Sequence, residues 1–513
     1  MGRVDDSESR YEAVASRDLR FEGRFVVAVT STGVYCRVGC PSRTPRRDRV
    51  RFFASPAAAS AAGFRPCKRC RPDRAGDAEA PLVQRALELI AAGVVDTEGV
   101  DGLARRLAVD VRTLHRRLAG SVGATPLQLA RSRRVQTART LIARTAMPLV
   151  DVAFAAGFGS LRQFNDVMRA DLGGAPSGHR GEAARAGEPD PDPGGWLSLR
   201  LPVREPFAAG PLFAFLAARA VPGVESLGDG DDPLAAGAVP SYARALRTPH
   251  GAAVVVIGPG PGHVALRVRL DDLADLENVV RRCRRLLDLD SDPASVAAIL
   301  GRDPLLRRLL AGSPGVRVPG SAEPFETAVR AVLGQQVSVA AARTLARRLV
   351  ARHGEALASP HDGVSHLFPT PERLAEADLD GLGLTGRRVA SVRALSRAVA
   401  AGDLDLVAGD AAGIDLAMSR LPGFGPWTRA YIAMRARGDP DAIPVGDLGL
   451  RHAMERLGEP ADPRSIARRS EAWRPWRAYA ALLLWQSLSV APASGETIPP
   501  SAIRPPLTTE PPP

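Results

Sequence analysis

The sequence predicts a multidomain protein that is mainly α-helical and has two α+β parts. Three observations support this fold class. A chain of 513 residues is long enough for three or four domains of ordinary size. A stretch rich in Gly, Pro, Asp and Ala at residues 182–195 is typical of a flexible linker between domains. Strand-like runs are concentrated in residues 25–40 and 252–270, whereas helical periodicity dominates elsewhere.

The chain is strongly basic, which favours an anionic partner such as nucleic acid. Its net charge is +12 and its isoelectric point is about 10.4. An Arg-rich proteome would produce the same balance, so composition alone does not identify the partner. No run of about 18 apolar residues occurs, and the N-terminus carries no apolar signal region. We therefore expect a cytoplasmic protein that does not span a membrane.

Residues 1–75 form the first expected unit, a small α+β domain built around a metal site. Four of the five cysteines lie there, as one Cys-x3-Cys pair (Cys36 and Cys40) and one Cys-x2-Cys pair (Cys67 and Cys70). In a cytosolic chain, clustered cysteines favour a metal over disulfides, and this spacing is typical of tetrahedral Zn²⁺ with four thiolates. The alternative is a set of four reduced thiols. Because the domain is small, zinc is expected to supply much of its folding free energy.

The cysteine segments carry a family resemblance. The phrases GVYCRVGC at residues 33–40 and GFRPCKRCRPD at residues 63–73 resemble the N-terminal domain of the Ada methylation-response family. The resemblance implies that Cys36 accepts a methyl group from a methyl phosphotriester in DNA. Methylation would remove one negative charge from the site and so strengthen DNA binding. The alternative is a purely structural zinc site. Contacts to the DNA backbone are expected from Arg43, Arg46, Arg47 and Arg49.

Residues 82–181 form an expected all-α domain. Residues 103–118 fit a helix-turn-helix with Asp110 as the N-cap of its second helix, residues 150–168 repeat the pattern, and a long helix at residues 126–143 joins the two. This arrangement, and the phrase Ala-x3-Gly-Phe-x-Ser, resemble the AraC-type DNA-binding domain. The resemblance implies a transcriptional activator that acts on promoter DNA and RNA polymerase. The candidate groove-facing residues are Arg112, His115, Arg116, Leu161, Arg162 and Asn165, for each of which a phosphate or solvent contact is the alternative.

Residues 196–315 form the second expected α+β part. A hairpin at residues 252–270 precedes two expected helices, residues 272–287 and 293–311. The phrase FAFLAARAVPGVE at residues 213–225 resembles the N-terminal domain of the AlkA-type 3-methyladenine glycosylases.

The fifth cysteine, Cys283, lies between arginines on an expected helix and is predicted to be inert. The chain contains no Pro-Cys-His-Arg phrase, which the alkylguanine methyltransferases carry. We therefore expect the second activity of the Ada family to be absent.

Residues 316–490 are expected to form an all-α domain. Gly423 and Gly425 permit a tight turn that exposes backbone N–H groups at the start of a helix at residues 427–436, an arrangement that binds phosphate. A single acid, Asp447, follows 22 residues after Gly425. The alternative is an ordinary interhelical turn followed by a helix N-cap.

The whole constellation carries a second resemblance. The phrase LPGFGPW at residues 421–427, with Asp447, resembles the helix-hairpin-helix plus Gly/Pro-Asp motif of the DNA glycosylase superfamily. The resemblance implies that the hairpin grips DNA and that Asp447 faces the sugar of an extruded nucleotide. The phrase AVLGQQVSVA at residues 331–340 matches the AlkA-type segment that fills the gap left by the flipped base, although an apolar residue is usual where Gln336 stands. The residues expected to contact DNA here are Gly423, Phe424, Gly425 and Gln336.

Four of the five tryptophans lie between residues 427 and 485, although aromatic residues are scarce in the chain. Electron-rich rings attract cationic alkylated bases, whereas core packing is the alternative role for any single tryptophan. By the family resemblance, the base pocket consists of Phe215, Trp427, Tyr431 and Trp485.

The expected chemistry is hydrolytic. Asp447 would stabilise the positive charge that develops on the sugar and orient or deprotonate water. Bifunctional relatives carry a lysine where this chain has Trp427, and residues 188–513 contain no lysine. A lysine-based lyase step is therefore not expected.

These inferences predict an adaptive response to DNA alkylation by a monofunctional DNA-3-methyladenine glycosylase fused to a zinc methyl phosphotriester acceptor and transcriptional regulator. The alternative is a methylation-activated transcription factor whose glycosylase half binds DNA but is inactive. The expected cofactor is Zn²⁺, the expected partners are double-stranded DNA and RNA polymerase, and the expected state is a monomer. Residues 491–513 are expected to be a disordered Pro-rich tail.

Overall fold

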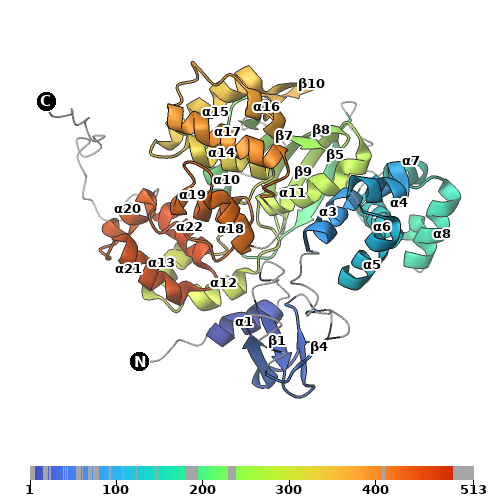
Figure 1. Ribbon diagram of the computed structural model, residues 1–513, viewed down its shortest axis with the longest axis horizontal. Coiled ribbons are helices and arrows are strands. Elements are labelled where there is room, and N and C mark those ends of the chain that lie inside the picture. Colours follow the sequence, from blue (N-terminus) through green and yellow to red (C-terminus); the bar gives the residue numbers. More distant parts are fainter. Residues whose placement is uncertain are drawn as a thin grey trace.

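The computed structural model confirms a multidomain, mainly helical protein with two separate sheet-containing parts (Figure 1). None of the helices in the described part of the chain is long and apolar enough to cross a membrane. The structure describes residues 6–488, with the exception of residues 16–20, 22–24, 39, 41, 43, 54–58, 60–61, 68–71, 73–79, 92–93, 108, 123, 145–146, 173, 180–194, 229–238 and 407–410. The predicted linker at 182–195, apart from Gly195, and the predicted tail at 491–513 therefore lie outside the described residues.

The N-terminal part, which we call the zinc module (the described residues between 6 and 72), combines one helix with a four-stranded sheet of order β3-β1-β2-β4. Strands β1 and β2 form an antiparallel hairpin, and β4 pairs in parallel with β2. Its elements are α1 (Asp6–Ala15), β1 (Val26–Val29), β2 (Val34–Cys36), η2 (Arg47–Arg49), β3 (Val50–Phe53) and β4 (Arg65–Pro66).

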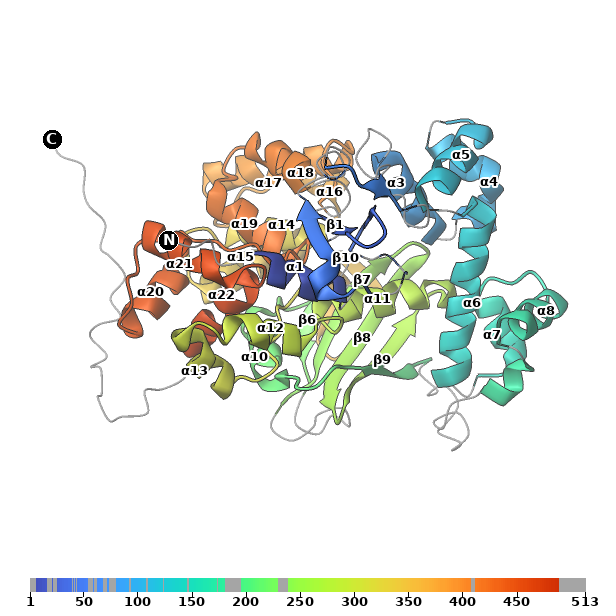
Figure 2. The same ribbon diagram turned by 90° about the horizontal axis from the view of Figure 1, so that it is seen from below.

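The next part is all-α, as predicted, and its two helix-turn-helix units are joined by the long helix α6. Asp110 is the predicted N-cap, because its Oδ1 accepts a hydrogen bond of 2.8 Å from the backbone N–H of Thr113. Figure 2 shows α6 standing between the large sheet and helices α7 and α8. The elements are α3 (Ala80–Ala91), α4 (Val94–Arg106), α5 (Val111–Val122), α6 (Pro126–Arg144), α7 (Leu149–Ala155), α8 (Leu161–Leu172) and η4 (Pro176–His179).

The large sheet is antiparallel, has the order β5-β9-β8-β7-β6, and contains the predicted hairpin as β8 and β9. Alternate residues of β5 and β9 point into a hydrophobic core shared with α10 and α11. Its elements are β5 (Leu197–Pro202), α10 (Ala209–Arg219), β6 (Glu225–Leu227), β7 (Tyr242–Thr248), β8 (Gly251–Gly260), β9 (His263–Leu270), η5 (Leu273–Asp275) and α11 (Leu276–Leu286).

The prediction of one helix over residues 293–311 was wrong, because the structure has two helices, α12 (Pro293–Leu300) and α13 (Pro304–Gly312). Asp303 starts the second helix by accepting hydrogen bonds from two first-turn N–H groups, the shorter being 2.8 Å. Pro304 then occupies the first helical position, where its missing N–H costs nothing.

The C-terminal part contains helices α14 to α22 and one hairpin that was not predicted. The hairpin strands, β10 (Glu355–His361) and β11 (Val364–Leu367), lie against β7 of the large sheet. The helices are α14 (Pro324–Leu333), α15 (Val339–His353), α16 (Pro371–Glu376), α17 (Gly386–Ala400), α18 (Ala411–Ser419), α19 (Pro426–Arg435), α20 (Leu448–Arg456), α21 (Pro463–Ser470), η6 (Glu471–Trp473) and α22 (Arg477–Ser487).

Two hydrophobic cores divide these helices, and the site described below lies where they meet. One core includes α14, α15, α17 and α18, and the other includes α13, α20, α21 and α22. Helix α19 contributes to both cores, and its Tyr431 packs against both. Tyr431 therefore lies at the junction between the two hydrophobic cores.

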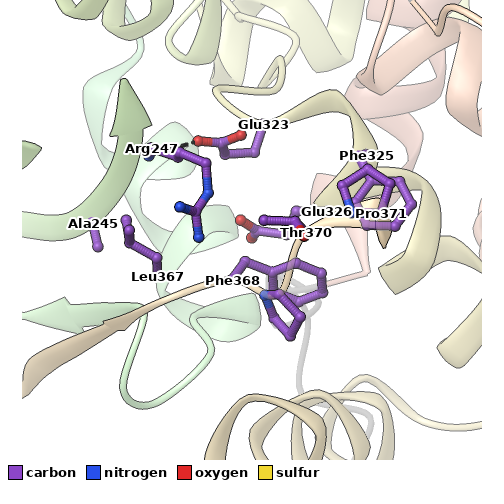
Figure 3. Close-up of a pocket in the computed structure, with 10 residues that line it drawn as sticks. Ala245, Arg247, Glu323, Phe325, Glu326, Leu367, Phe368, Thr370 and Pro371 are labelled. Carbon is purple, nitrogen blue, oxygen red and sulfur yellow. Dashed lines mark hydrogen bonds between the residues drawn. The ribbon is translucent and has the colours of Figure 1, made fainter. Parts of the chain in front are cut away.

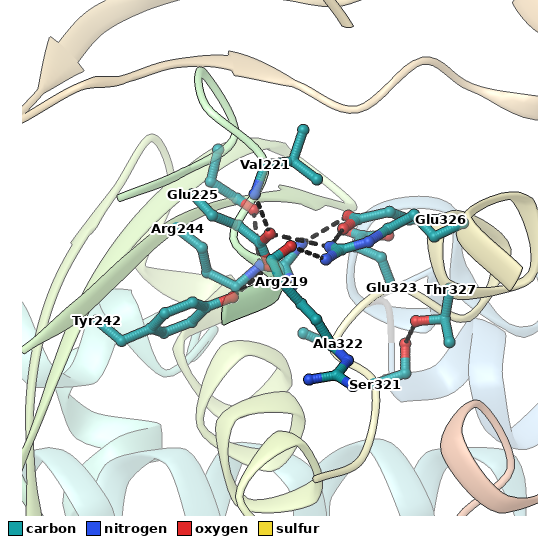
Figure 4. A network of polar contacts seen from close by, with 12 residues as sticks. Arg219, Val221, Glu225, Tyr242, Arg244, Ser321, Ala322, Glu323, Glu326 and Thr327 are labelled. Atoms are coloured by element: carbon teal, nitrogen blue, oxygen red, sulfur yellow. Dashed lines mark hydrogen bonds and ion pairs between the residues drawn. The ribbon is translucent and has the colours of Figure 1, made fainter. Parts of the chain in front are cut away.

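A buried network of charged side chains fastens the large sheet to α14 (Figure 4). Arg330 of α14 contacts Glu225 of β6 at 2.9 Å and Glu326 at 2.7 Å, and Arg244 of β7 also contacts Glu326 at 2.7 Å. Burial alone would raise the pKa of Glu225, but Arg330 and Arg244 outweigh it and hold that pKa below its ordinary value. Breaking one member would leave a charge buried without its partner, so the network holds the two parts in one arrangement.

Candidate functional site

The carboxylate of Asp447 lies at the start of α20, where three N–H groups converge on it. The backbone N–H of Leu450 and the indole Nε1–H of Trp485 donate to Oδ1, each at 2.9 Å. The indole Nε1–H of Trp427 donates to Oδ2 at 2.8 Å. Asp447 is thus a helix N-cap, as the structural alternative held, but it is also clamped between two tryptophans from distant helices. A cap alone does not require those indoles.

Glycine at position 449 makes this clamp possible. A Cβ atom there would lie 2.9 Å from Asp447 Oδ1 and 3.1 Å from the indole Nε1 of Trp485. Contacts this close would displace the carboxylate or the ring, so only glycine fits without rearrangement. The sequence analysis missed this role, although a glycine two residues after a capping acid was the available signal.

The predicted pocket aromatics on α19 and α22 come together around the carboxylate. Trp427 and Tyr431, one helical turn apart, stack with ring centroids 5.3 Å apart and an angle of 15°. The rings of Tyr431 and Trp485 are 6.4 Å apart and inclined at 48°. Each of the three side chains is only partly buried. Other aromatic residues of this region, Trp473, Trp476 and Tyr479, are fully buried in the core instead.

Phe215 joins this group through arginines that the sequence analysis did not identify. The guanidinium of Arg219 lies 3.7 Å from the ring centroid of Phe215, and that of Arg435 lies 4.6 Å from it. Arg435 also donates a hydrogen bond of 2.9 Å to the Tyr431 hydroxyl. The available signal was their position four residues after Phe215 and Tyr431, which places each on the same helix face as its partner.

These arginines make the floor of the aromatic group electropositive. Burial alone would raise the pKa of Tyr431, but Arg435 and then Arg219 outweigh it, so that pKa falls below its ordinary value. Burial also lowers the pKa of the Arg219 guanidinium.

The hairpin before α19 has the geometry of a tight turn. Gly423 has a φ of 81°, and a Cβ atom there would lie 2.2 Å from the Ser391 hydroxyl oxygen. Gly425 is the N-cap of α19, and a Cβ atom at that position would meet nothing within 4 Å in the described part of the chain. A bare backbone beside open space at a helix N-terminus suits the approach of an anion. The side chain of Phe424 does not take part, because it is 3% exposed and packs in the core.

Gln336 lies in the turn between α14 and α15, exposed and with a positive φ of 54°. The preceding residue, Gln335, was not identified from the sequence. Its Nε2 donates to the backbone oxygen of Gly423 at 2.8 Å and to the hydroxyl of Thr428 at 2.9 Å. Arg388 donates to the backbone oxygen of Gln335. One side-chain amide therefore ties the turn that carries Gln336 to the glycine hairpin.

The zinc module brings three of the predicted ligands together. The Sγ atoms of Cys36, Cys40 and Cys67 all lie within 4.8 Å of one another, and all three residues are buried. Cys36 is the last residue of β2, and Cys67 follows the parallel strand β4. The backbone N–H of Cys67 donates to the backbone oxygen of Tyr35 at 2.9 Å. Three thiols at this spacing fit tetrahedral Zn²⁺, whose Zn–S bonds are about 2.3 Å long. The fourth predicted ligand, Cys70, lies outside the described residues.

The predicted DNA-contacting side chains of the N-terminal half lie at the protein surface wherever the structure describes them. Arg112 and Arg116 on α5 and Arg162 on α8 are exposed, whereas His115, Leu161 and Asn165 are half-buried. Arg43 lies outside the described residues. Arg46 and Arg47 are exposed and line an open hollow together with Tyr11 and Asp48. Arg49 is also exposed and pairs with Asp48.

A separate cavity of about 80 Å³ lies between the large sheet and the helices α14 and α16 (Figure 3). It is lined by Arg247, Glu323, Glu326 and Phe368, and by none of the residues around Asp447. A water molecule occupies about 30 Å³ of liquid, so this cavity suits a few waters and not a nucleobase.

Four family descriptions match successive stretches of the chain. They are the metal binding domain of Ada (residues 9–73), a helix-turn-helix domain (103–182), the AlkA N-terminal domain (198–323) and the HhH-GPD superfamily base excision DNA repair protein (329–478).

Among curated proteins, the chain is 49% identical to the "probable bifunctional transcriptional activator/DNA repair enzyme AlkA" of Mycobacterium tuberculosis, over 94% of this chain and 97% of that protein. It is 35% identical to the "DNA-3-methyladenine glycosylase 2" of Escherichia coli, over 53% of this chain and 92% of that protein. Among solved structures, a 3-methyladenine DNA-glycosylase from Archaeoglobus fulgidus has a TM-score of 0.48 at 21% identity, covering 56% of this chain and 97% of that one.

Proposed function

This chain belongs to the family of bifunctional transcriptional activator/DNA repair enzymes of the AlkA type, and on that premise we propose that it releases alkylated bases from DNA by hydrolysis at Asp447. It combines a glycosylase with an Ada-type regulatory half. The observation that carries the proposal is the Asp447 carboxylate held by the indole N–H groups of Trp427 and Trp485. A carboxylate needed only as a helix cap would not require two indole donors from other helices.

In the proposed reaction the glycosidic C1′–N bond breaks and its electron pair leaves with the base. The sugar then carries oxocarbenium character, which the Asp447 carboxylate stabilises. Water adds its oxygen to C1′ and gives up a proton to Asp447 or to solvent. Oδ1 accepts two of the three hydrogen bonds and Oδ2 accepts one, so Oδ2 retains more capacity to orient the water. An alkylated base is already a good leaving group, so no strong general acid is needed.

The proposed base recess is the space beside Trp427, Tyr431 and Trp485, where an extruded base would stack on an aromatic face. Gln336 would enter the gap in the duplex, and the backbone around Gly425 would hold a phosphate.

A lyase step is not part of the proposal. Trp427 stands where bifunctional relatives carry the Schiff-base lysine, and residues 188–513 contain no lysine. Water is therefore the nucleophile.

For the regulatory half we propose that Cys36 accepts a methyl group from a methyl phosphotriester. The residues present fit zinc, with Cys36, Cys40 and Cys67 as three ligands and Cys70 as the fourth, and zinc when bound keeps the thiolates deprotonated. The Cys36 sulfur forms a bond to the methyl carbon while the methyl–oxygen bond breaks, and the DNA phosphodiester leaves as an anion. The helix-turn-helix units, residues 82–181, would then act at a promoter with RNA polymerase as a partner.

The deciding experiment compares wild type and Asp447→Asn in release of alkylated bases from methylated duplex DNA under single-turnover conditions. Asparagine still caps α20, so the variant should fold normally, yet the rate should fall by about 10²–10³ or more. Equal inactivity of both proteins would favour a regulator whose C-terminal half only binds DNA. Equal activity would show that Asp447 is not the catalytic group. Binding to undamaged DNA serves as the control and should be unchanged.

A further inference from the structure

The zinc module touches the C-terminal helical part at one defined place, the residues that lead into α22. The ring of Phe21 packs edge-on against the indole of Trp476, with centroids 5.4 Å apart and planes at 87°. The two side chains are 2% and 1% exposed, and Trp476 makes a second edge contact of 5.4 Å with Tyr479. A phenylalanine from the N-terminal module thus caps an aromatic pair at the start of the last helix.

Apolar and charged neighbours extend this contact. Ala13 and Val14 of α1 are buried in the same hydrophobic core as Trp476. Arg10 of the same helix is half-buried, and its burial and then the nearby charge of Arg474 lower its pKa. Figures 1 and 2 both show α1 beside α12, which belongs to this core.

At the edge of the contact, the charged side chains next to α22 are paired with one another. Arg474 pairs with Glu471 at 2.9 Å and also with Asp441, so its charge is compensated where Arg10 approaches it. Buried aromatic packing with paired charges around it is the composition of a specific interface.

The helix at this interface also reaches the proposed base recess. Trp476 is the N-cap of α22, and Trp485 on the same helix donates to Asp447 Oδ1 at 2.9 Å. Residues 478–484 between them are all buried, so α22 is tightly packed over the length that separates Trp476 from Trp485.

We propose that the surface around Trp476 is a docking site for the chain's own zinc module, and that docking through Phe21 holds α22 in the position from which Trp485 reaches Asp447. The docking itself follows from the contacts, whereas its effect on base release rests on the proposed glycosylase function. The damage-sensing half is then a supporting part of the repair half.

Tryptophan fluorescence tests the docking without any enzymatic assay. All five tryptophans lie at position 196 or later, so the zinc module contributes none, and emission reports on the other parts of the chain. In the full-length, zinc-loaded protein, Phe21→Ala should expose Trp476, shift its emission to longer wavelength and raise quenching by acrylamide. In a Trp476→Phe background the same substitution should give a smaller change, because only the displacement of Trp485 is then left to alter the emission. Unchanged emission and quenching in folded, zinc-loaded Phe21→Ala would overturn the docking.

The rate of base release tests the second part of the proposal, the effect of docking on the Asp447 site. Phe21→Ala should lower the single-turnover rate by about tenfold, the scale expected for a small displacement of a catalytic group, with DNA affinity unchanged. An unchanged rate in a variant whose fluorescence shows undocking would overturn the link to Asp447 while the docking stands. If the wild type releases no base, the glycosylase proposal fails, and the proposed effect of docking on base release fails with it. The fluorescence result then still decides whether the zinc module docks.

Discussion

The thiol cluster and the Asp447 site are both small polar groups, but the chain assembles them by opposite means. The three described cysteines of the cluster lie within 32 residues of one another: Cys36 ends β2, Cys40 lies in the turn that follows β2, and Cys67 directly follows β4. The Asp447 site draws on α19, α20 and α22, and its indole donors are set by helices packed in two hydrophobic cores. The first site is local and depends on a metal, whereas the second is long-range and depends on packing.

This contrast predicts what each site tolerates. A metal-held cluster loses its geometry when the ligand bonds go, because the thiols have no other group that fixes their mutual distances. A packed site survives metal loss but is sensitive to any atom added where helices touch. Metal removal and two substitutions test this difference between the sites.

The largest effect should come from metal removal. Chelation should abolish methyl gain by Cys36, measured by mass spectrometry after exposure to methyl phosphotriester DNA, because the thiolates then protonate. Base release should fall by no more than about tenfold, which reflects undocking of the zinc module and not loss of the recess.

Thiol labelling provides the control for this experiment. After chelation the zinc-module cysteines should react with a thiol reagent at neutral pH. Cys283 should stay unreactive until the protein unfolds, because burial raises its pKa to about 12. Complete loss of base release on chelation, or reaction of Cys283 in the folded protein, would contradict the separation of the two sites.

The second effect concerns the packed site. Gly449→Ala should lower the single-turnover rate of base release by about a hundredfold, because its Cβ atom would lie 2.9 Å from Asp447 Oδ1 and would push the carboxylate from its indole donors. Zinc content and methyl transfer should not change. Gly210→Ala in α10, where a Cβ atom meets nothing within 4 Å, is the matched control and should retain the wild-type rate. A Gly449→Ala variant within twofold of wild type would show that packing does not define this site.

The sequence was informative where function is carried by a local phrase. The cysteine spacing, the glycine hairpin and Asp447 each stand in a short motif, so their chemistry could be inferred without coordinates. Trp427 and Tyr431 were assigned to the base pocket from the family resemblance, and this role stays a prediction, although their two rings do lie together on one helix.

The sequence was silent where a role exists only across elements. Arg219 and Arg435 lie in different parts of the chain and meet at one aromatic ring. The helix break before Pro304 was missed although the sequence carries a signal for it, since Gly301 can end a helix and the pair Asp303 and Pro304 is typical of an N-cap followed by the first helical residue. The strands β10 and β11 were missed because their polar, half-exposed residues show no clear alternation and rely on the neighbouring sheet.

Gln335 is the clearest case of a residue with no signal of its own, and it gives the smallest predicted effect. Its amide joins the turn of Gln336 to the hairpin through Gly423 and Thr428, so it should set the distance between the two elements that we propose to contact DNA. Gln335→Leu should lower the rate of base release by about tenfold while affinity for undamaged DNA changes little.

A fluorescent base analogue placed beside the lesion distinguishes positioning from a loss of fold, because it reports extrusion of the nucleotide directly. Its signal should weaken in Gln335→Leu at unchanged melting temperature. Thr428→Val removes only one of the two hydrogen-bond acceptors and should have a smaller effect, and the double variant should be no worse than Gln335→Leu alone, since both changes act on one contact. Additive losses, or normal extrusion in Gln335→Leu, would mean that the hairpin and the Gln336 turn find their spacing without this amide.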